Sequence, residues 1–201
     1  MPQLILLRHG ESQWNLENRF TGWVDVPLSS RGENEAKQAG LKLKPYSIDL
    51  AYTSVLRRAI DTLGLALEAA GKKGIPIQQA PALHERHYGE LQGLNKEETA
   101  AKFGKEQVLL WRRSYDVAPP GGESLKDTAA RTLPYYREAI LKDLSRGKNV
   151  LVVAHGNSLR SIIMEIEKLS SKEILKVEIP TATPIVYEFD DNLKLKSKKI
   201  L

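Results

Sequence analysis

The chain has 201 residues, of which 41% are hydrophobic and 27% are charged, and these proportions exclude a largely disordered protein. This length predicts one domain over residues 1–201 rather than two independent domains. Lys and Arg exceed Asp and Glu by five, which favours anionic partners such as metabolites, nucleic acid or lipid headgroups. The lack of cysteine excludes disulfides and thiolate metal sites.

The first predicted elements alternate between strands and helices. Leu4–Leu7 is an unbroken aliphatic run, typical of a strand that is buried on both faces. This run is too short for a signal sequence or a membrane span, so we expect a cytoplasmic protein with no membrane partner. Ser30 and Glu33 have the spacing of a capping box and predict a helix that runs to about Leu43. The next predicted elements are a strand over Ile48–Thr53, a helix over Val55–Ala70 and a strand over Ile75–Gln79.

The second half of the chain continues this alternation. Asn95, Ser124 and Ser170 are each followed by acidic residues and predict the N-caps of three further helices. Ala118–Gly122 is rich in Pro and Gly and predicts a surface loop. Later strands are predicted over Asn149–Ala154 and Pro184–Phe189, followed by a solvated edge or tail over Lys194–Lys199. The pattern predicts an α/β fold with three layers, α/β/α, around a mainly parallel sheet.

Two His-Gly pairs follow the two most aliphatic strands. His9 and Gly10 come after the first strand, and His155 and Gly156 come after the later one. Ligands of parallel sheets collect outside the carboxyl ends of the strands, so the two histidines could meet in one crevice. A single such histidine could equally serve a structural role at the end of its strand. Two pairs in equivalent positions favour a shared site.

Arg8, beside His9, indicates the kind of ligand. A guanidinium next to a neutral imidazole suits a dianionic phosphoryl group better than a metal cation. The other histidines, His84 and His87, lack the H-E-x-x-H spacing of zinc enzymes, so we expect no metal site. An imidazole can accept a phosphoryl group when its second nitrogen is held as a donor, and Arg8, Arg58 and His155 are candidates to stabilise the transferring group.

Glu85 is a candidate acid or base for a substrate hydroxyl. It stands in a dense polar stretch, His84–Gly89. Taken alone, this carboxylate fits a surface salt bridge better than a catalytic role, because exposed glutamates are common.

Longer motifs resemble the histidine phosphatase superfamily, and within it the cofactor-dependent phosphoglycerate mutases. Arg8–Asn15 leads into Asn18–Trp23, a long motif that is similar to the one in this family. Further blocks that look like the same family are Thr53–Ala59, Glu85–Gly89, Leu91–Lys96, Trp111–Arg113, Ala154–Arg160 and Ile179–Thr181. The similarity extends over nearly the whole chain, and it favours a catalytic Glu85.

The resemblance implies roles for individual residues. His9 would carry the phosphoryl group, Glu85 would donate and accept the proton, and His155 would steady the transferring group, while Arg8 and Arg58 would clamp it. The residues implied to bind the substrate's phosphates and carboxylate are Gly10, Glu11, Ser12, Asn15, Thr21, Gly22, Arg86, His87, Tyr88, Lys96, Arg112, Arg113, Gly156 and Asn157.

The implied reaction interconverts 3-phosphoglycerate and 2-phosphoglycerate. Its cofactor would be 2,3-bisphosphoglycerate, which phosphorylates the enzyme, and no metal would be required. The expected partners are small phosphorylated three-carbon acids, with a homodimer as one possible assembly. The chain departs from the family in a shorter stretch after Pro119–Gly122 and in a shorter C-terminus. It also has His84 where the family usually has Asn, and Ala182 where the family often has Gly.

Two alternatives follow from these departures and from the charge. A phosphatase of the same superfamily would pass the phosphoryl group from His9 to water, which a less well covered site favours. A basic nucleic-acid-binding domain would use Arg112, Arg113 and the Lys-rich C-terminus, but no recognised nucleic-acid motif is present.

Overall fold

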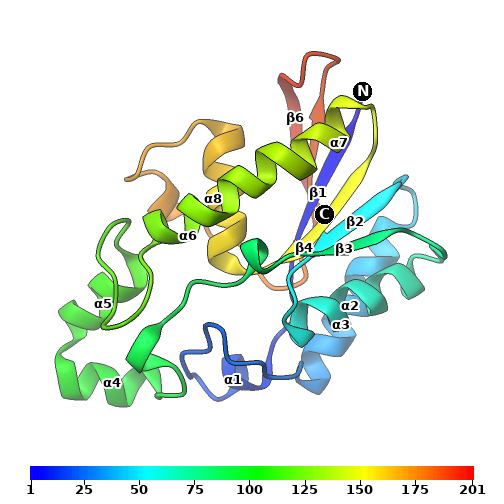
Figure 1. The fold of residues 1–201 in the computed structure, drawn as a ribbon. Coiled ribbons are helices and arrows are strands. Elements are labelled where there is room, and N and C mark those ends of the chain that lie inside the picture. The colour runs from blue at the N-terminus through cyan, green and yellow to red at the C-terminus, as the bar shows by residue number, and fades with distance from the viewer.

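A six-stranded sheet forms the centre of the computed structural model, which describes residues 1–201 (Figure 1). The strand order is β3-β2-β4-β1-β5-β6. The first four of these are parallel to one another, β5 is antiparallel to β1, and β6 is antiparallel to β5. The strands are β1 (Gln3–Arg8), β2 (Leu50–Thr53), β3 (Ile77–Gln79), β4 (Val150–Ala154), β5 (Ile185–Phe189) and β6 (Leu195–Ile200).

Helices cover both faces of the sheet, which confirms the predicted three-layer α/β/α fold. On one face lie α2 (Ser30–Leu43) and α3 (Arg57–Ala69), and on the other lie α6 (Leu125–Tyr135), α7 (Leu141–Ser145) and α8 (Gly156–Glu167) (Figure 1). The remaining helices, beyond the carboxyl ends of the parallel strands, are α1 (Gln13–Leu16), α4 (Lys96–Phe103) and α5 (Lys105–Arg113). Single turns at Pro81–Leu83, Gly89–Leu91 and Ile174–Lys176, and a wider turn at Tyr136–Ile140, complete the chain.

The alternation of side chains along β1 explains the two layers of core. Leu4 and Leu6 belong to a core cluster with residues of α7, α8 and the turn Tyr136–Ile140, whereas Ile5 and Leu7 belong to a cluster with residues of α2 and α3. All four side chains are at most 1% exposed. A strand with apolar side chains on both faces needs a helical layer on each side, and this is why the run carries no polar residue.

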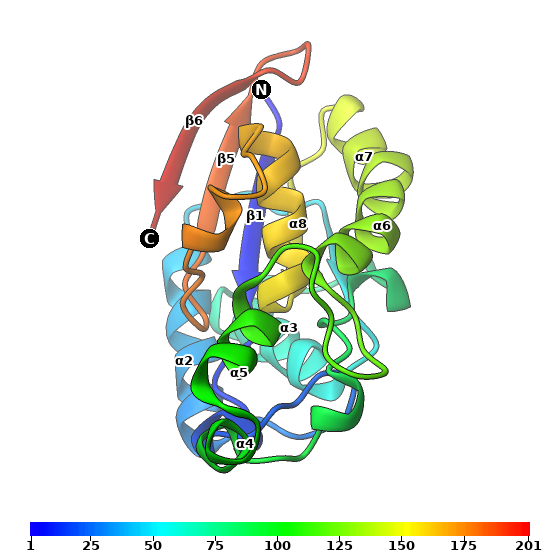
Figure 2. The ribbon, with the colours of Figure 1, turned by 90° about the vertical axis from the view of Figure 1, so that its left-hand side faces the viewer.

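The sheet opens a crevice where its connections diverge. The chain leaves β1 toward α2 on one face and leaves β4 toward α8 on the opposite face. Figure 2, seen from the side of α8, shows this helix lying over β1. Because β1 and β4 are adjacent and parallel, their carboxyl ends flank a crevice of the kind in which α/β proteins bind ligands.

The structure corrects two predicted helix starts. The N-cap of α2 is Ser29, not Ser30, because the Ser29 hydroxyl accepts a hydrogen bond from the backbone N–H of Gly32. The predicted helix after Ser170 is wrong: Ser170 and Glu173 make the reciprocal hydrogen bonds of a capping box, but only a single turn follows. The N-caps at Asn95 and Ser124 are confirmed.

Two further predictions concern the bounds of elements. Helix α3 begins at Arg57, two residues later than predicted. Lys194–Lys199 mostly belongs to the exposed edge strand β6.

Ala182 has a φ of 45°, the left-handed conformation that glycine adopts more readily. None of the helices is both long enough and apolar enough to cross a lipid bilayer.

Candidate active site

The crevice between β1 and β4 brings the two His-Gly pairs together. Arg8 pairs with Ala154 in the sheet, so His9 and His155 follow at equivalent positions of neighbouring strands. The backbone N–H of His9 continues the ladder by donating to the Ala154 carbonyl at 3.0 Å. The centroids of the two imidazole rings lie 5.0 Å apart.

His9 is held in a single orientation. Its Nδ1 lies 2.7 Å from the Gly10 carbonyl oxygen, which acts as the acceptor, so Nδ1 carries the proton and Nε2 keeps its lone pair. Burial, followed by the positive charges of Arg58 and Arg8, holds the pKa of His9 well below its usual value. The imidazole is therefore neutral at physiological pH, as a nucleophile must be.

The carbonyl that orients His9 is itself fixed. The backbone N–H of Gly10 donates to the Thr62 hydroxyl of α3 at 3.0 Å. A side chain at position 10 would place its Cβ 2.3 Å from the Gly32 carbonyl oxygen at the start of α2. Glycine is therefore required here by the close approach of α2.

His155 is completely buried and is held by a residue from a third strand. Its Nε2 lies 2.7 Å from the hydroxyl of Ser54, which follows the carboxyl end of β2. The Nδ1 atom has no hydrogen-bond partner. Burial, followed by the charge of Arg58, lowers the pKa of His155 well below its usual value.

Two arginines supply positive charge beside these rings. The terminal nitrogens of Arg58 donate to the carbonyls of Val24 and Gly22, and one terminal nitrogen of Arg8 donates to the carbonyl of Ile179. Both Nε atoms are buried without a partner. Burial lowers the pKa of Arg58 to about 10, so this side chain remains charged at neutral pH. The two guanidiniums thus have donors left for an anion.

Glu85 has one carboxylate oxygen fixed and the other free. Its Oε1 accepts hydrogen bonds from the backbone N–H of Arg86 and from both the backbone and the side-chain amide of Asn157. Burial raises the pKa of Glu85, but these hydrogen bonds and the charges of Arg8 and Arg58 outweigh it and keep the pKa below its usual value. Glu85 is therefore ionised, and its Oε2 makes no hydrogen bond within the protein.

Two cavities adjoin at this carboxylate. The first, of about 80 Å³, lies at the His9 side, and the second, of about 200 Å³, lies toward α5. They share the side chains of Arg8, Glu85, Tyr88 and Lys96. Burial, followed by the charge of Arg112, lowers the pKa of Lys96 to about 8. The two cavities therefore adjoin through four shared side chains, and both are lined by cationic residues.

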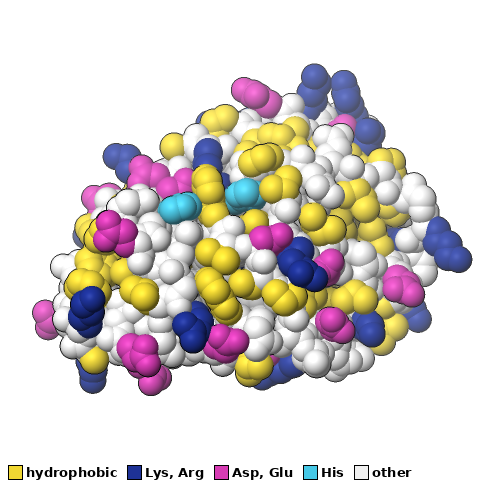
Figure 3. Space-filling model, turned by 60° about the horizontal axis from the view of Figure 1, so that its bottom comes forward, with side chains coloured by type: hydrophobic (Ala, Val, Ile, Leu, Met, Phe, Trp, Pro, Cys, Tyr) yellow, Lys and Arg dark blue, Asp and Glu magenta, His cyan; other side chains and the backbone are white.

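The second cavity is dominated by cations. Arg112 and Arg113 from the end of α5 face Arg160 of α8 across it. Besides Glu85, the cavity is lined by one other acidic residue, Glu178, and one of its oxygens lies 2.9 Å from Arg113. Elsewhere on this end of the molecule, Lys and Arg side chains are separated by Asp and Glu rather than forming one basic stripe (Figure 3).

Most residues singled out from the sequence line these cavities, and the rest lie behind them. The lining residues are Arg8, His9, Asn15, Thr21, Gly22, Arg58, Glu85, Tyr88, Lys96, Arg112, Arg113, Gly156 and Asn157. The residues that line neither cavity are Gly10, Glu11, Ser12, Arg86, His87 and His155. Ser12, for example, caps α1 and holds the Oδ1 of Asn15, which leaves the Asn15 Nδ2 for the pocket.

Sequence reasoning missed several residues of the site. Ser54 and Thr62 orient His155 and the Gly10 carbonyl, and Arg160 lines the second cavity. Arg19 and Phe20 line the first cavity. Ser54 and Arg160 lie within motifs already recognised, and the position of Ser54 at the carboxyl end of a parallel strand was a usable signal.

Comparison with known proteins assigns the family. Residues 4–197 match the model of the histidine phosphatase superfamily, branch 1. The chain belongs to this superfamily. Within it, the chain is 53% identical to a 2,3-bisphosphoglycerate-dependent phosphoglycerate mutase of Cytophaga hutchinsonii, over 98% of this chain and 92% of the relative. It is 56% identical to a protein of the same name from Nitrobacter hamburgensis, over 97% and 95% of the two chains.

Solved structures of this superfamily share the fold. The YhfR protein of Bacillus stearothermophilus superposes with a TM-score of 0.85 at 27% identity, covering 98% of this chain and 95% of that one. A mycobacterial glucosyl-3-phosphoglycerate phosphatase superposes with a TM-score of 0.84 at 27% identity, covering 100% and 97%. The fold and the family are thus supported by sequence and structure independently.

The relatives also differ from this chain, and from one another, in the number of inserted residues. A mutase of Lachnoclostridium phytofermentans aligns over 226 positions, 25 more than the 201 residues of this chain, so it contains inserted residues. The Nitrobacter mutase aligns over 197 residues, which are 95% of its own length. Relatives that are named as mutases therefore include a chain nearly as short as this one.

Proposed function

We propose that this protein is a 2,3-bisphosphoglycerate-dependent phosphoglycerate mutase that works through a phosphohistidine at His9. Relatives named for this activity exceed 50% identity over almost the whole chain. The substrates are 3-phosphoglycerate and 2-phosphoglycerate, and the proposed setting is the cytoplasm. We also infer that residues 1–201 form one domain, because the two large core clusters share a single sheet. A homodimer remains part of the proposal.

The pair of adjoining cavities carries this proposal. A phosphatase needs one region that binds the transferring phosphoryl group. A mutase must also hold the second phosphate and the carboxylate of the same molecule. The first cavity contains His9, Arg8 and Arg58, and the second adds Arg112 and Arg113. Bisphosphoglycerate carries roughly four to five negative charges, and the charges of these arginines and of Lys96 match it.

Unpartnered donors in and beside the first cavity fit a phosphoryl group. The Nε atoms of Arg8 and Arg58, the Thr21 hydroxyl and Nδ1 of His155 are buried without partners. Each can donate to a phosphoryl oxygen when it carries a hydrogen, and such donors stabilise the charge that spreads over these oxygens in the transition state. The bisphosphate supplies the phosphoryl group that primes His9.

The proposed chemistry uses His9 and Glu85 in turn. Nε2 of His9 forms a bond to phosphorus as the bond from phosphorus to the substrate oxygen breaks. Oε2 of Glu85, ionised in the free enzyme, takes the proton of the substrate hydroxyl when that hydroxyl attacks the phosphohistidine, and it returns this proton to the leaving oxygen when the phosphoryl group moves back to His9. His155 stays neutral, held by Ser54, and its ring lies 5.0 Å from that of His9, close enough to meet the transferring group.

A phosphatase activity at the same site is the second candidate. The glucosyl-3-phosphoglycerate phosphatase superposes over the whole chain, which supports this alternative. In a phosphatase, water would take the place of the substrate hydroxyl at Glu85. The two activities share every step up to the phosphohistidine, so only the acceptor distinguishes them.

A coupled assay tests the proposal. We expect 3-phosphoglycerate to be converted to 2-phosphoglycerate only when trace 2,3-bisphosphoglycerate is present. We also expect His9→Ala to abolish both turnover and the acid-labile phosphoenzyme formed from bisphosphoglycerate. Release of inorganic phosphate that outpaces 2-phosphoglycerate formation would replace the mutase by the phosphatase. A labelled phosphoenzyme in the His9→Ala protein would move the nucleophile elsewhere.

A further inference from the structure

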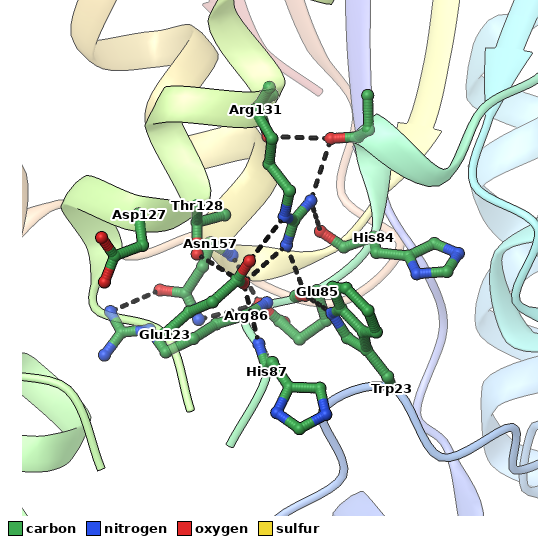
Figure 4. Close-up of polar contacts among 12 residues, drawn as sticks. Trp23, His84, Glu85, Arg86, His87, Glu123, Asp127, Thr128, Arg131 and Asn157 are labelled. Carbon is green, nitrogen blue, oxygen red and sulfur yellow. Dashed lines mark hydrogen bonds and ion pairs between the residues drawn. The ribbon is translucent and has the colours of Figure 1, made fainter. Parts of the chain in front are cut away.

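The guanidinium of Arg131, on α6, points toward the backbone segment that carries Glu85 (Figure 4). One terminal nitrogen donates to the carbonyls of Ala82 and His84 at 3.0 and 3.2 Å, and the other donates to the carbonyl of Glu85 at 2.8 Å. Arg131 thus binds the main chain at three points within four residues. The planar fork of a guanidinium can do this, whereas an ammonium group cannot span the same acceptors.

Glu123 binds Arg131 and also forms hydrogen bonds with the main chain of the same segment at His87, on the C-terminal side of Glu85. Its two oxygens accept hydrogen bonds from Nε and a terminal nitrogen of Arg131, both at 2.8 Å. One oxygen also accepts from the backbone N–H of His87, and the backbone N–H of Glu123 donates to the His87 carbonyl at 2.7 Å. Burial raises the pKa of Glu123, but the hydrogen bonds from Arg131 and His87 outweigh it and keep this pKa low.

Trp23 adds a contact at the same carbonyl. Its indole N–H donates to the Glu85 carbonyl at 2.6 Å, and the guanidinium of Arg131 lies 5.4 Å from the centre of its ring. The Glu85 carbonyl is therefore held from two directions, and the Glu85 Oε1 is held by Asn157 and the Arg86 N–H. With both ends of the residue fixed, the position of Oε2 is determined.

We propose that Arg131, together with Glu123, is a positioning residue that sets Oε2 of Glu85 for proton transfer. Neither side chain lines either cavity. About a fifth of each is exposed, and the pair acts through the main chain of residues 82–87. The inference rests on the proposed role of Glu85 in proton transfer. It holds whether a phosphoglycerate hydroxyl or water accepts the phosphoryl group.

The leaving group separates positioning of Glu85 from general damage to the fold. When the phosphoryl group moves from 2,3-bisphosphoglycerate to Nε2 of His9, the departing oxygen is an alkoxide and needs a proton, which Oε2 of Glu85 delivers after taking it from solvent or from a substrate hydroxyl. When it moves from 4-nitrophenyl phosphate, the departing nitrophenolate is stable as an anion and needs no proton. A displaced Glu85 therefore slows the first transfer and spares the second.

The test compares Arg131→Gln with Arg137→Gln, a matched control. Arg137 makes a similar two-bond pair with Glu165, at 2.8 and 3.0 Å, on the exposed surface away from the cavities. We expect Arg131→Gln to slow phosphorylation of His9 by 2,3-bisphosphoglycerate roughly 10²-fold, the usual effect of about 1 Å of misplacement. The burst of nitrophenolate from 4-nitrophenyl phosphate should change by less than about threefold, because that step needs no general acid. Arg137→Gln should change neither rate.

Two milder variants keep the inference testable if Arg131→Gln does not fold. Arg131→Lys retains the charge but loses the planar guanidinium that reaches three carbonyls. Glu123→Gln retains the size of the side chain but weakens the hydrogen bond from the backbone N–H of His87. We expect both to show the same selective loss, to a smaller degree. Equal loss with both phosphate donors, or an unchanged rate with bisphosphoglycerate, would overturn the inference. Failure of the wild-type protein to form 2-phosphoglycerate would instead refute the mutase, and the comparison of donors would still stand.

Discussion

Acid should destabilise this protein well above the pH at which its carboxylates titrate. His9, His155 and His84 are at most 9% exposed, and burial is the largest cause that lowers each pKa. The charge of Arg58 adds to the effect at all three, and that of Arg131 adds to it at His84. The pKa of His84 falls to about 4, and those of His9 and His155 lie well below their usual value.

The sign and size of the effect follow from proton linkage. In the unfolded chain each histidine has a pKa of about 6.5 and binds a proton as the pH falls through that value, whereas the folded protein does not. Protonation therefore favours the unfolded state, and stability is lost as the pH drops below about 6.5. Between pH 7 and pH 5 each histidine removes about 2 kcal/mol. The three together remove about 6 kcal/mol, comparable with the whole stability of many domains.

Urea unfolding at pH 7, 6 and 5 measures this loss. Stopping at pH 5 keeps most carboxylates out of the titration, because their pKa values lie near or below about 4.3. His84→Asn should recover about a third of the loss, about 2 kcal/mol, since it removes one of the three protons. A free energy of unfolding that is equal at pH 7 and pH 5 would refute the claim that these imidazoles are buried and neutral.

Two further predictions concern Glu85 and Gly10. Glu85→Gln should still form the phosphoenzyme, but transfer should slow by roughly two to four orders of magnitude; unchanged turnover in the coupled assay would return Glu85 to a structural ion pair. Gly10→Ala should lower the free energy of unfolding by roughly 1–3 kcal/mol, because its Cβ would lie 2.3 Å from the Gly32 carbonyl oxygen. A Cβ at Gly64 in α3 would meet no atom within 4 Å, so Gly64→Ala should instead raise the free energy of unfolding by up to about 1 kcal/mol. Equal melting temperatures for the two variants would contradict this reading.

The sheet could be predicted from the sequence because its strands are encoded locally. An aliphatic run such as Leu4–Leu7 can be satisfied only between two helical layers, so it predicts both a strand and its surroundings. The histidine that follows such a run lies at the carboxyl end of a strand by necessity. The meeting of His9 and His155 depended on one additional assumption, that the two strands are neighbours.

The supporting residues could not be predicted because their partners are distant in sequence. Ser54 bonds His155 across 101 positions, and Thr62 bonds Gly10 across 52. Arg131 is one of many arginines on helices, and nothing local distinguishes it from Arg137. The misplaced N-cap has a local cause: Ser29 and Ser30 are both good caps, and the hydroxyl that meets the Gly32 N–H decides between them.

The site is arranged at a cost to the stability of the free protein. Two neutral imidazoles and the Arg58 guanidinium are buried together, and Glu85 is the anion that most raises the pKa of Arg58. The donors that remain unpartnered, Nε of Arg8 and Nε of Arg58, lose hydrogen bonds to water without gaining others. A phosphoryl group supplies both the missing charge and the missing acceptors. The features that lower the stability of the free protein are therefore those that bind the anion, and binding of the substrate must stabilise the fold by the same interactions.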